Sequence, residues 1–150
     1  MLVRTKYGIG QSFSADMGQT WSPGESTKLA GANSRFHMSR LSSGRLLFVT
    51  NAPRGTALVD TNTMKRSHLC AFLSDDDGDT WPHGLLLDGR DAVSYPDCAQ
   101  DSDGTIHIIY DRDRYSEREI LMASVAEENI VQGAVCDRSS ELGIVVSRGA

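Results

Sequence analysis

The eight residues SDDDGDTW, from Ser74 to Trp81, repeat the pattern of an earlier stretch, SADMGQTW, from Ser14 to Trp21. Both copies keep a serine, an aspartate, a glycine, a threonine and a tryptophan at the same spacing. The shared positions are Ser14, Asp16, Gly18, Thr20 and Trp21 in the first copy and Ser74, Asp76, Gly78, Thr80 and Trp81 in the second. A pattern kept this closely indicates a structural unit that the chain uses twice.

The residue types of this pattern suit a tight turn between two strands. An aspartate carboxylate accepts backbone N–H groups across a turn, and glycine adopts backbone angles that other residues resist. The hydroxyl groups can tie the loop ends together, and the tryptophan can pack on the sheet beyond. A calcium loop is the acidic alternative, but counting back from Gly78 in an EF-hand frame puts Leu73 first and Gly84 twelfth, where acids are required. We therefore predict a structural turn without a catalytic role.

Strand-length segments separated by Gly, Asp, Ser and Pro turns dominate the rest of the chain. They are 34–41, 45–51, 67–74, 84–89, 92–100, 105–111 and 119–125. Helical periodicity is scarce, and only AEENIVQGAV (Ala126–Val135) suits a helical turn. The end of the chain from Asp137 onward shows little pattern of either strand or helix. This pattern predicts an antiparallel all-β protein.

The predicted strands fall into units of four, as in the blades of a β-propeller. We expect a single propeller segment of about two and a half blades over 1–150. Its parts are a partial blade over 1–30, a full blade over 31–90, a last blade over 91–132 and a C-terminal tail over 133–150. A blade cannot cover both of its faces alone, so blades require neighbours.

Composition limits the classes of partner. The 150 residues carry a net charge of −5, which disfavours nucleic acid, and no apolar run approaches the roughly 18 residues that span a bilayer.

Cys70, Cys98 and Cys136 are too widely spaced for a zinc site or a disulfide framework. The four histidines show no metal spacing, and no Ser-His-Asp set is apparent, so we expect neither metal nor cofactor. The first ten residues do not read as a signal peptide, and the sequence indicates no compartment.

The two turns resemble the Asp boxes, or BNR repeats, of the sialidase (neuraminidase) superfamily, whose members are six-bladed propellers. The stretch VSYPDCAQDSDGTIHIIYDRDRYSEREILMASVAEENI, from Val93 to Ile130, is similar to the last catalytic blade of bacterial sialidase-like proteins. The resemblance covers roughly Leu2 to Ile130. It implies the C-terminal part of an exo-α-sialidase-like glycoside hydrolase, which removes terminal sialic acid or a related acidic sugar.

The resemblance also implies roles for individual residues. Tyr95, in SYPD, matches the family's tyrosine nucleophile, although Pro96 stands where the family has serine. Arg66 and Arg4 precede the two Asp boxes, where the family places arginines that clamp the substrate carboxylate. Asp111 stands where a glutamate of the family braces an arginine.

The same residue types also have ordinary structural explanations. A tyrosine can fill a blade interface, and most arginines and strand-end acids are solvated. Arg35 and Arg40 flank an apolar strand and are weaker candidates for substrate contact. The run DRDRYSERE, from Asp111 to Glu119, is most simply a solvated loop of alternating charge.

By the same matching, the family's first arginine, its aspartate acid/base and the glutamate that activates the tyrosine lie in blades before this chain begins. We therefore expect the remaining blades to come from upstream sequence or another copy, and little turnover by the chain alone. The expected partner is a sialylated or other acidic glycan. A non-catalytic Asp-box module that binds glycans or proteins, and another polysaccharide-active enzyme of the same repeat family, remain open alternatives.

Overall fold

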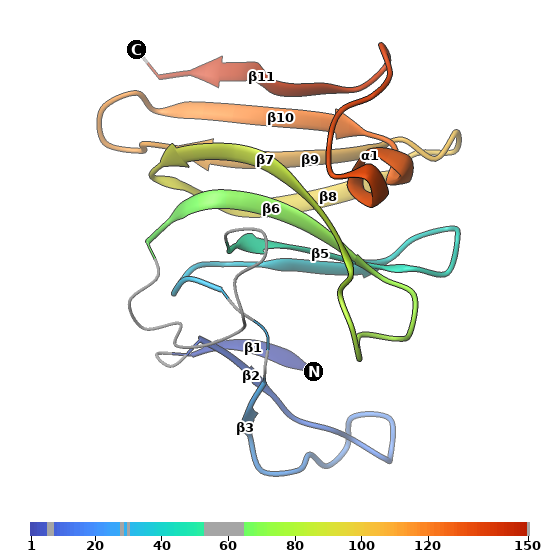
Figure 1. Cartoon of the computed structure of the whole chain (residues 1–150). Coiled ribbons are helices and arrows are strands. Elements are labelled where there is room, and N and C mark those ends of the chain that lie inside the picture. Colours follow the sequence, from blue (N-terminus) through green and yellow to red (C-terminus); the bar gives the residue numbers. More distant parts are fainter. Residues whose placement is uncertain (6–7, 28, 30, 53–64, 150) are drawn as a thin grey trace.

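The computed structural model describes residues 1–5, 8–27, 29, 31–52 and 65–149 (Figure 1). Within these residues the protein is all-β, with three antiparallel sheets and one short helix. The prediction of an all-β fold built from short strands is therefore confirmed.

Each sheet is a meander in which strands adjacent in the chain pair side by side. The first sheet contains β1 (Leu2–Thr5), β2 (Gly8–Gln11) and β3 (Glu25–Ser26). The second contains β4 (His37–Arg40), β5 (Leu46–Asn51), β6 (Ser67–Ser74) and β7 (His83–Asp91). The third contains β8 (Val93–Gln100), β9 (Ile106–Arg112), β10 (Glu119–Val125) and β11 (Glu141–Arg148), with α1 (Glu127–Gln132) between its last two strands.

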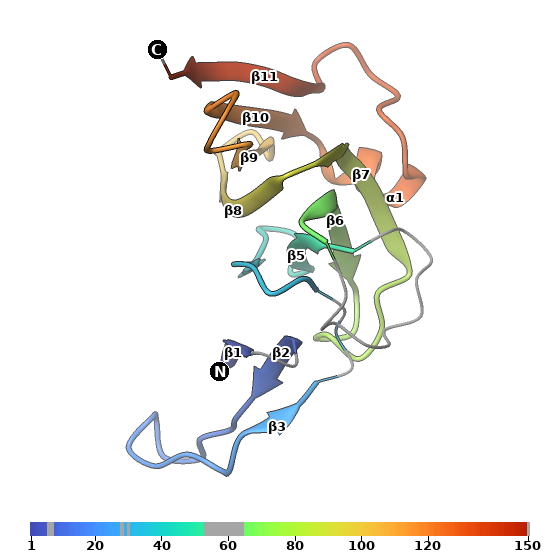
Figure 2. The ribbon, with the colours of Figure 1, turned by 90° about the vertical axis from the view of Figure 1, so that its left-hand side faces the viewer.

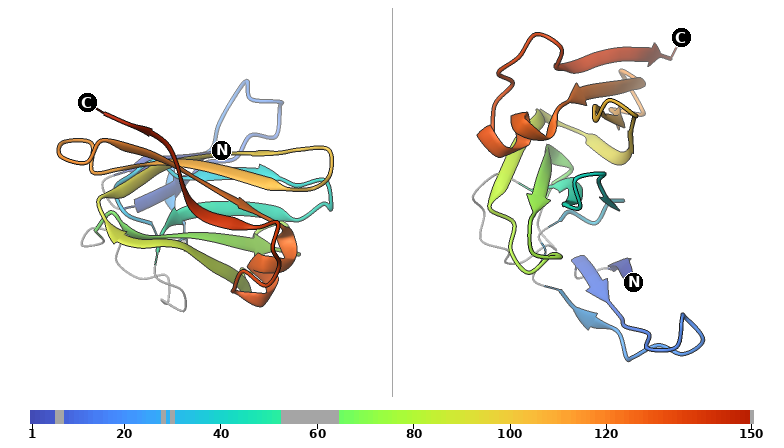
Figure 3. Two further views of the ribbon diagram at one scale, coloured as in Figure 1. Left: turned by 90° about the horizontal axis from the view of Figure 1, so that it is seen from above. Right: turned by 90° about the vertical axis from the view of Figure 1, so that its right-hand side faces the viewer.

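The three sheets follow one another in chain order, as consecutive propeller blades do (Figure 2). The strand β8 packs against β4, β5 and β6 of the preceding sheet. The views in Figure 3 place the N-terminus at the first sheet and the C-terminus at the far edge of the third. The arrangement is consistent with part of a propeller.

The main core lies between the second and third sheets. Strand alternation builds it: along β10, the buried residues Leu121, Ala123 and Val125 alternate with the more accessible Ile120 and Met122. Other core residues are Leu47, Val49, Leu69, Leu73, Leu85, Val93, Ile106, Ile108, Tyr110 and Ile130. Burial of this apolar surface is the main stabilising contribution to the packing of the two sheets.

The second Asp box connects β6 to β7 through a closed set of hydrogen bonds. Asp76 accepts from the Ser74 hydroxyl at 2.8 Å, from the Thr80 backbone N–H at 2.8 Å and from the Thr80 hydroxyl at 2.6 Å. The Ser74 hydroxyl accepts from the Gly78 N–H at 2.9 Å, and the Trp81 indole donates to the Gly78 carbonyl at 3.2 Å. Gly78 has φ of 98°, which side-chain-bearing residues rarely adopt. The bonds from Thr80 and Ser74 lower the pKa of Asp76 to about 2.

The first Asp box, between β2 and β3, reproduces these contacts. Asp16 accepts from the Ser14 hydroxyl at 2.8 Å and from the Thr20 hydroxyl at 2.6 Å, and the same kind of bonding lowers its pKa to about 2. The tryptophans differ in their packing: the Trp21 side chain is 47% exposed, whereas the second-box tryptophan lies 5.4 Å from the ring of Phe48. The predicted role of the turn as a strand connection agrees with this geometry.

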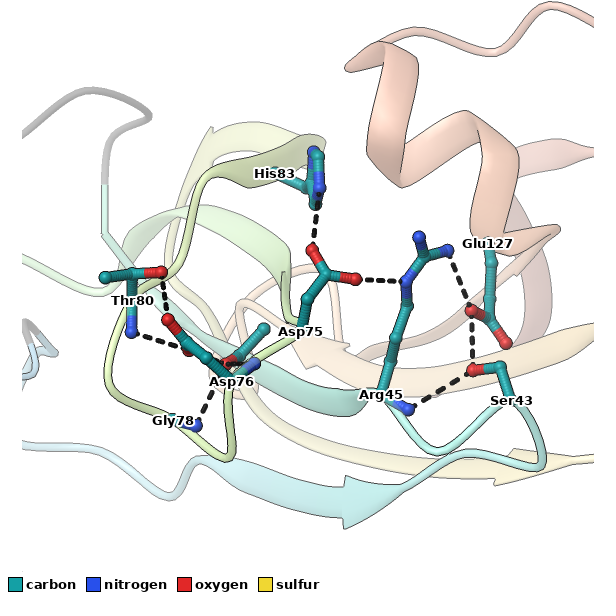
Figure 4. Close-up of polar contacts among 9 residues, drawn as sticks. Ser43, Arg45, Asp75, Asp76, Gly78, Thr80, His83 and Glu127 are labelled. Carbon is teal, nitrogen blue, oxygen red and sulfur yellow. Dashed lines mark hydrogen bonds and ion pairs between the residues drawn. The ribbon is translucent and has the colours of Figure 1, made fainter.

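An ion-pair chain links the second box to the helix (Figure 4). Asp75 accepts from Arg45 Nε at 2.7 Å and lies 3.1 Å from His83 Nε2. Arg45 also contacts Glu127 of α1, which accepts a hydrogen bond from Ser43 at 2.9 Å. The turn therefore connects the second sheet to the helix of the third.

One C-terminal feature differs from the expectations and another agrees with them. The segment 133–150, expected as a tail, contributes β11, which pairs with β10 as the fourth strand of the third sheet. Five residues of β11 pair with β10, namely Glu141, Ile144, Val145, Ser147 and Arg148, while Val145 and Val146 stay about half exposed. Backbone pairing, more than burial, therefore holds this strand. The helical turn conceivable after Val125 is α1.

Candidate functional site

Tyr95 lies on a bulge in β8, the strand of the third sheet that contacts the second sheet. Ser94 pairs with Asp111 and Asp97 pairs with Ile109, so Tyr95 and its neighbour together oppose one residue of β9. Tyr95 has φ of 56°, a left-handed conformation that is costly for a tyrosine. Bulges of this kind redirect a side chain out of the regular strand alternation. Here the bulge brings the phenol toward the other two sheets.

Arg4 and Arg66 both approach this phenol. Arg4, on β1, donates from Nη1 to Tyr95 Oη at 3.3 Å. Arg66 lies immediately before β6, and its Cζ is 5.2 Å from the centroid of the tyrosine ring. Arg4 from the first sheet, Arg66 from the residue that leads into the second sheet and Tyr95 from the third sheet are thus brought together.

The main chain fixes the position of Arg66 beside β8. Its carbonyl accepts a hydrogen bond from the Val93 N–H at 3.1 Å, and its guanidinium donates to the Asn33 carbonyl at 3.1 Å. Asn51 adds a second link between the sheets by donating to the Val93 carbonyl at 3.0 Å. Among the described residues, neither Arg4 nor Arg66 forms an ion pair with a carboxylate. Their charges are therefore available to an anionic ligand.

Asp111 holds an arginine, but one that the sequence did not single out. Arg114 donates to Asp111 Oδ2 from Nε at 2.9 Å and from Nη2 at 2.6 Å. The Ser94 hydroxyl donates to Asp111 Oδ1 at 2.8 Å and accepts from Arg114 at 3.2 Å. Arg114 Cζ lies 4.5 Å from the centroid of the Tyr95 ring. The Asp-x-x-Arg spacing, which begins near the end of β9, is the sequence signal for this contact, although the alternating charges of the run favour a solvated loop.

The arginines around Tyr95 change its acidity. The hydrogen bond from Arg4 is the largest influence and lowers the pKa of Tyr95, with further lowering from Arg114 and from the charge of Arg66. Burial acts in the opposite direction. The cause is the stabilisation of the negatively charged phenolate by neighbouring cations.

Two shallow hollows meet at Tyr95. One, of about 390 Å³, is lined by Arg35, Tyr95, Asp97, Ile109, Tyr110, Asp111, Arg114 and Ile120. The other, of about 420 Å³, is lined by Leu2, Arg4, Arg35, Phe36 and Tyr95. The phenol and Arg35 border both, so a ligand seated at Tyr95 has room on either side.

The two weaker arginine candidates lie in different surroundings. Arg35 borders both hollows and pairs with Asp97 at 2.7 Å. Arg40 pairs with Asp77 of the second Asp box at 2.7 Å and lines neither hollow. Of the two, the structure brings only Arg35 to the candidate site.

The structure also forms a Ser-His-Asp chain that was not apparent in the sequence. His37 Nδ1 lies 2.9 Å from Asp97 Oδ1, and its Nε2 lies 3.0 Å from the Ser39 hydroxyl. The serine and histidine come from β4 and the carboxylate from β8, so the contact exists only because two sheets meet. Ser39 lines none of the hollows described, and the chain ties β4 to β8.

The described part of the chain contains no group of three or more His, Cys, Asp or Glu residues placed to hold a metal ion. Its one helix, α1, has six residues, and no described helix could cross a membrane.

Comparison with known protein families identifies the repeats. The family model described as a BNR repeat-like domain matches residues 1–108, which include both Asp boxes, Arg4, Arg66 and Tyr95. No curated protein and no solved structure matches the chain. Since the matched residues make up well over half of its length, the chain belongs to the BNR repeat-like domain family.

Proposed function

We propose that the chain forms part of an exo-α-sialidase-like glycoside hydrolase that removes terminal sialic acid or a related acidic sugar. The observation that carries the proposal is the convergence on Tyr95, in the third sheet, of Arg4 from the first sheet and of Arg66 from the entry to the second. The remaining propeller blades would come from further sequence or from another copy.

The two arginines suit a sugar carboxylate. A guanidinium group keeps its charge at all physiological pH values and presents a planar set of donors that matches a carboxylate. Arg4 is exposed, and neither guanidinium is neutralised by a described carboxylate, so one anionic group can bind both. The acidic exterior, with a net charge of −5, leaves this pair as a local positive site.

Tyr95 would act as the nucleophile. Its Oη would attack the anomeric carbon of the sugar while a general base accepts the phenol proton, the bond to the leaving-group oxygen breaks and a general acid protonates that oxygen. Water would then release the sugar from the glycosyl–tyrosine intermediate, with overall retention. A phenol suits an anionic substrate because, when neutral, it does not repel the sugar carboxylate, and tyrosine is a known exception to the paired-carboxylate rule of glycosidases.

Among the described residues, no carboxylate accepts a hydrogen bond from Tyr95. The proposal therefore assigns the general acid and base to residues outside the described site, and the chain alone is expected to bind the sugar with little turnover.

Calorimetric titration of the chain with N-acetylneuraminic acid tests the binding step. Replacing Arg66 by Gln removes charge-assisted hydrogen bonds worth about 1.5–3 kcal/mol, which weakens binding roughly tenfold to a hundredfold. Arg40→Gln is the matched control, because Arg40 pairs with Asp77 away from the site. Equal affinity in all three proteins would refute the carboxylate clamp.

Turnover tests the chemical step. Hydrolysis of a fluorogenic sialoside by the complete protein containing this chain should be lost in the Tyr95→Phe variant. Undiminished activity in that variant would remove the nucleophile assignment.

The family match itself favours a second candidate, a non-catalytic Asp-box module that binds glycans or proteins. Both boxes close through their own hydrogen bonds and do not require the arginines. Glycan binding without hydrolysis of any acidic sugar would support this module, whereas hydrolysis of a different acidic sugar would indicate another polysaccharide-active enzyme of the family.

A further inference from the structure

Arg114, in the connection between β9 and β10, stacks on the ring of Tyr95 in β8. Its Cζ lies 4.5 Å from the ring centroid, closer than the 5.2 Å of Arg66. A guanidinium over an aromatic face is attracted to the ring and stays close to any negative charge on its oxygen.

The position of Arg114 is fixed by two partners. Asp111 accepts from both Nε and Nη2, and the buried Ser94 hydroxyl contacts both the arginine and the carboxylate. Ser94 directly precedes Tyr95, so the arginine is fixed relative to the backbone that carries the phenol. Such a forked, charge-assisted contact holds a long side chain in one geometry.

We propose that Arg114 is a positioning residue that, held by Asp111 and Ser94, makes Tyr95 the readily ionised and nucleophilic one among the tyrosines that the structure describes. Only the use of the Tyr95 phenol in glycoside cleavage rests on the proposed function. The reactivity of the phenol itself is a property of this chain and can be measured without a sugar.

The charges around the phenol support the inference. The groups that face or border it are Arg4 from β1, Arg66 before β6, Arg35 before β4, Asp97 from β8, Asp111 from β9 and Arg114 after β9. Asp111 is neutralised by Arg114, and Asp97 by Arg35. The remaining charge is positive, and the pKa of Tyr95 is lowered accordingly.

Other tyrosines provide internal references. Tyr110 is 1% exposed and donates to Asp88, and burial raises its pKa. Tyr115 is 87% exposed. If exposure alone controlled reactivity, Tyr115 would react before Tyr95.

A spectroscopic pH titration of the chain measures the ionisation directly. The phenolate absorbance of wild type minus that of Tyr95→Phe isolates the Tyr95 transition, which should lie below the ordinary tyrosine pKa of about 10. Arg114→Gln should move the transition to higher pH, Arg114→Lys should restore part of the shift, and Arg138→Gln should leave it in place. Arg138 is an exposed residue between α1 and β11 and controls for net charge. Coincident transitions in wild type and Arg114→Gln would overturn the proposal.

Labelling with an aryl sulfonyl fluoride tests nucleophilicity. The Tyr95 oxygen attacks sulfur, the S–F bond breaks with loss of fluoride, and the phenol proton passes to solvent. Peptide mass spectrometry should find Tyr95 modified faster than Tyr115 in wild type, and several-fold more slowly in Arg114→Gln. Faster labelling of Tyr115 in wild type would contradict the proposal.

Ser94→Ala provides a second variant should Arg114→Gln unfold, because it removes one contact of the arginine and keeps every charge. Its Tyr95 transition should also move to higher pH, and an unchanged transition in folded Ser94→Ala would count against the positioning role. A shifted, Arg114-dependent transition without sugar binding would refute the proposed function alone. Sugar binding with a transition that ignores Arg114 would refute this inference alone.

Discussion

Replacing Leu85 or Leu86 by alanine tests how β7 divides its two faces. Leu85 is 3% exposed and belongs to the core between the second and third sheets, whereas Leu86 is 41% exposed on the opposite face. Leu→Ala removes three carbons, worth about 2.4 kcal/mol at about 0.8 kcal/mol per buried carbon. A residual cavity raises the cost at Leu85, so we expect a loss of about 2–5 kcal/mol there. At Leu86 the loss should be about 1–1.5 kcal/mol, because much of the side chain already contacts water and no cavity forms.

Urea unfolding of the two variants, followed by circular dichroism, gives both losses from the midpoint at constant slope. The matched chemistry leaves burial as the main difference between them. Equal losses would refute the assignment of the two faces, since Leu86 would then have to be buried in an assembly.

Three further predictions concern the Asp boxes. Asp76→Asn should lower the urea midpoint clearly, since Asp76 accepts three hydrogen bonds within the turn. Asp77→Asn should have little effect, because Asp77 forms only an exposed ion pair, and equal midpoints in the two variants would contradict the structural role of Asp76 in the turn. Gly78→Ala should cost about 1–2 kcal/mol in thermal unfolding because φ is 98°, and a neutral effect would argue against that conformation. Asp16 and Asp76 have pKa values of about 2, below the ordinary 3.8, so their ionised carboxylates stabilise the folded state above pH 4 and this stabilisation is lost as the pH falls toward 2. The Asp76→Asn variant should therefore lose less stability on acidification than wild type, and an unchanged acid dependence of unfolding would contradict the lowered pKa of Asp76.

The regular strands were predictable because local chemistry determines them. The segment 67–74 combines apolar alternation with the Asp box that follows it, and β6 has the same bounds. The segment 119–125 likewise coincides with β10. Both strands bury one face in the core, so the hydrophobic pattern carries the information.

The outer strand β11 was not predicted because it satisfies its backbone on β10 while leaving Val145 and Val146 about half exposed. Such a strand has little periodic burial from which to recognise it. Its pairing depends on a sheet edge that a single sequence does not display.

Some residues of the candidate site could likewise be predicted from the sequence, and others could not. Tyr95, Arg4 and Arg66 were found through a family motif, and the structure brings them together. Arg114 was missed because its role depends on the bulge that turns Tyr95 toward it, and bulges have no reliable sequence pattern. The contact between His37 and Asp97 was missed because its partners come from separate sheets.

The central claim is that Arg4, Arg66 and Tyr95 form one site for an anionic sugar. Nuclear magnetic resonance of the chain during titration with N-acetylneuraminic acid tests it most directly, with the two arginine Nε–H signals and the Tyr95 ring signals as probes. We expect all three to shift along one saturation curve with a single dissociation constant. Signals that do not move, or that saturate at different sugar concentrations, would contradict the claim.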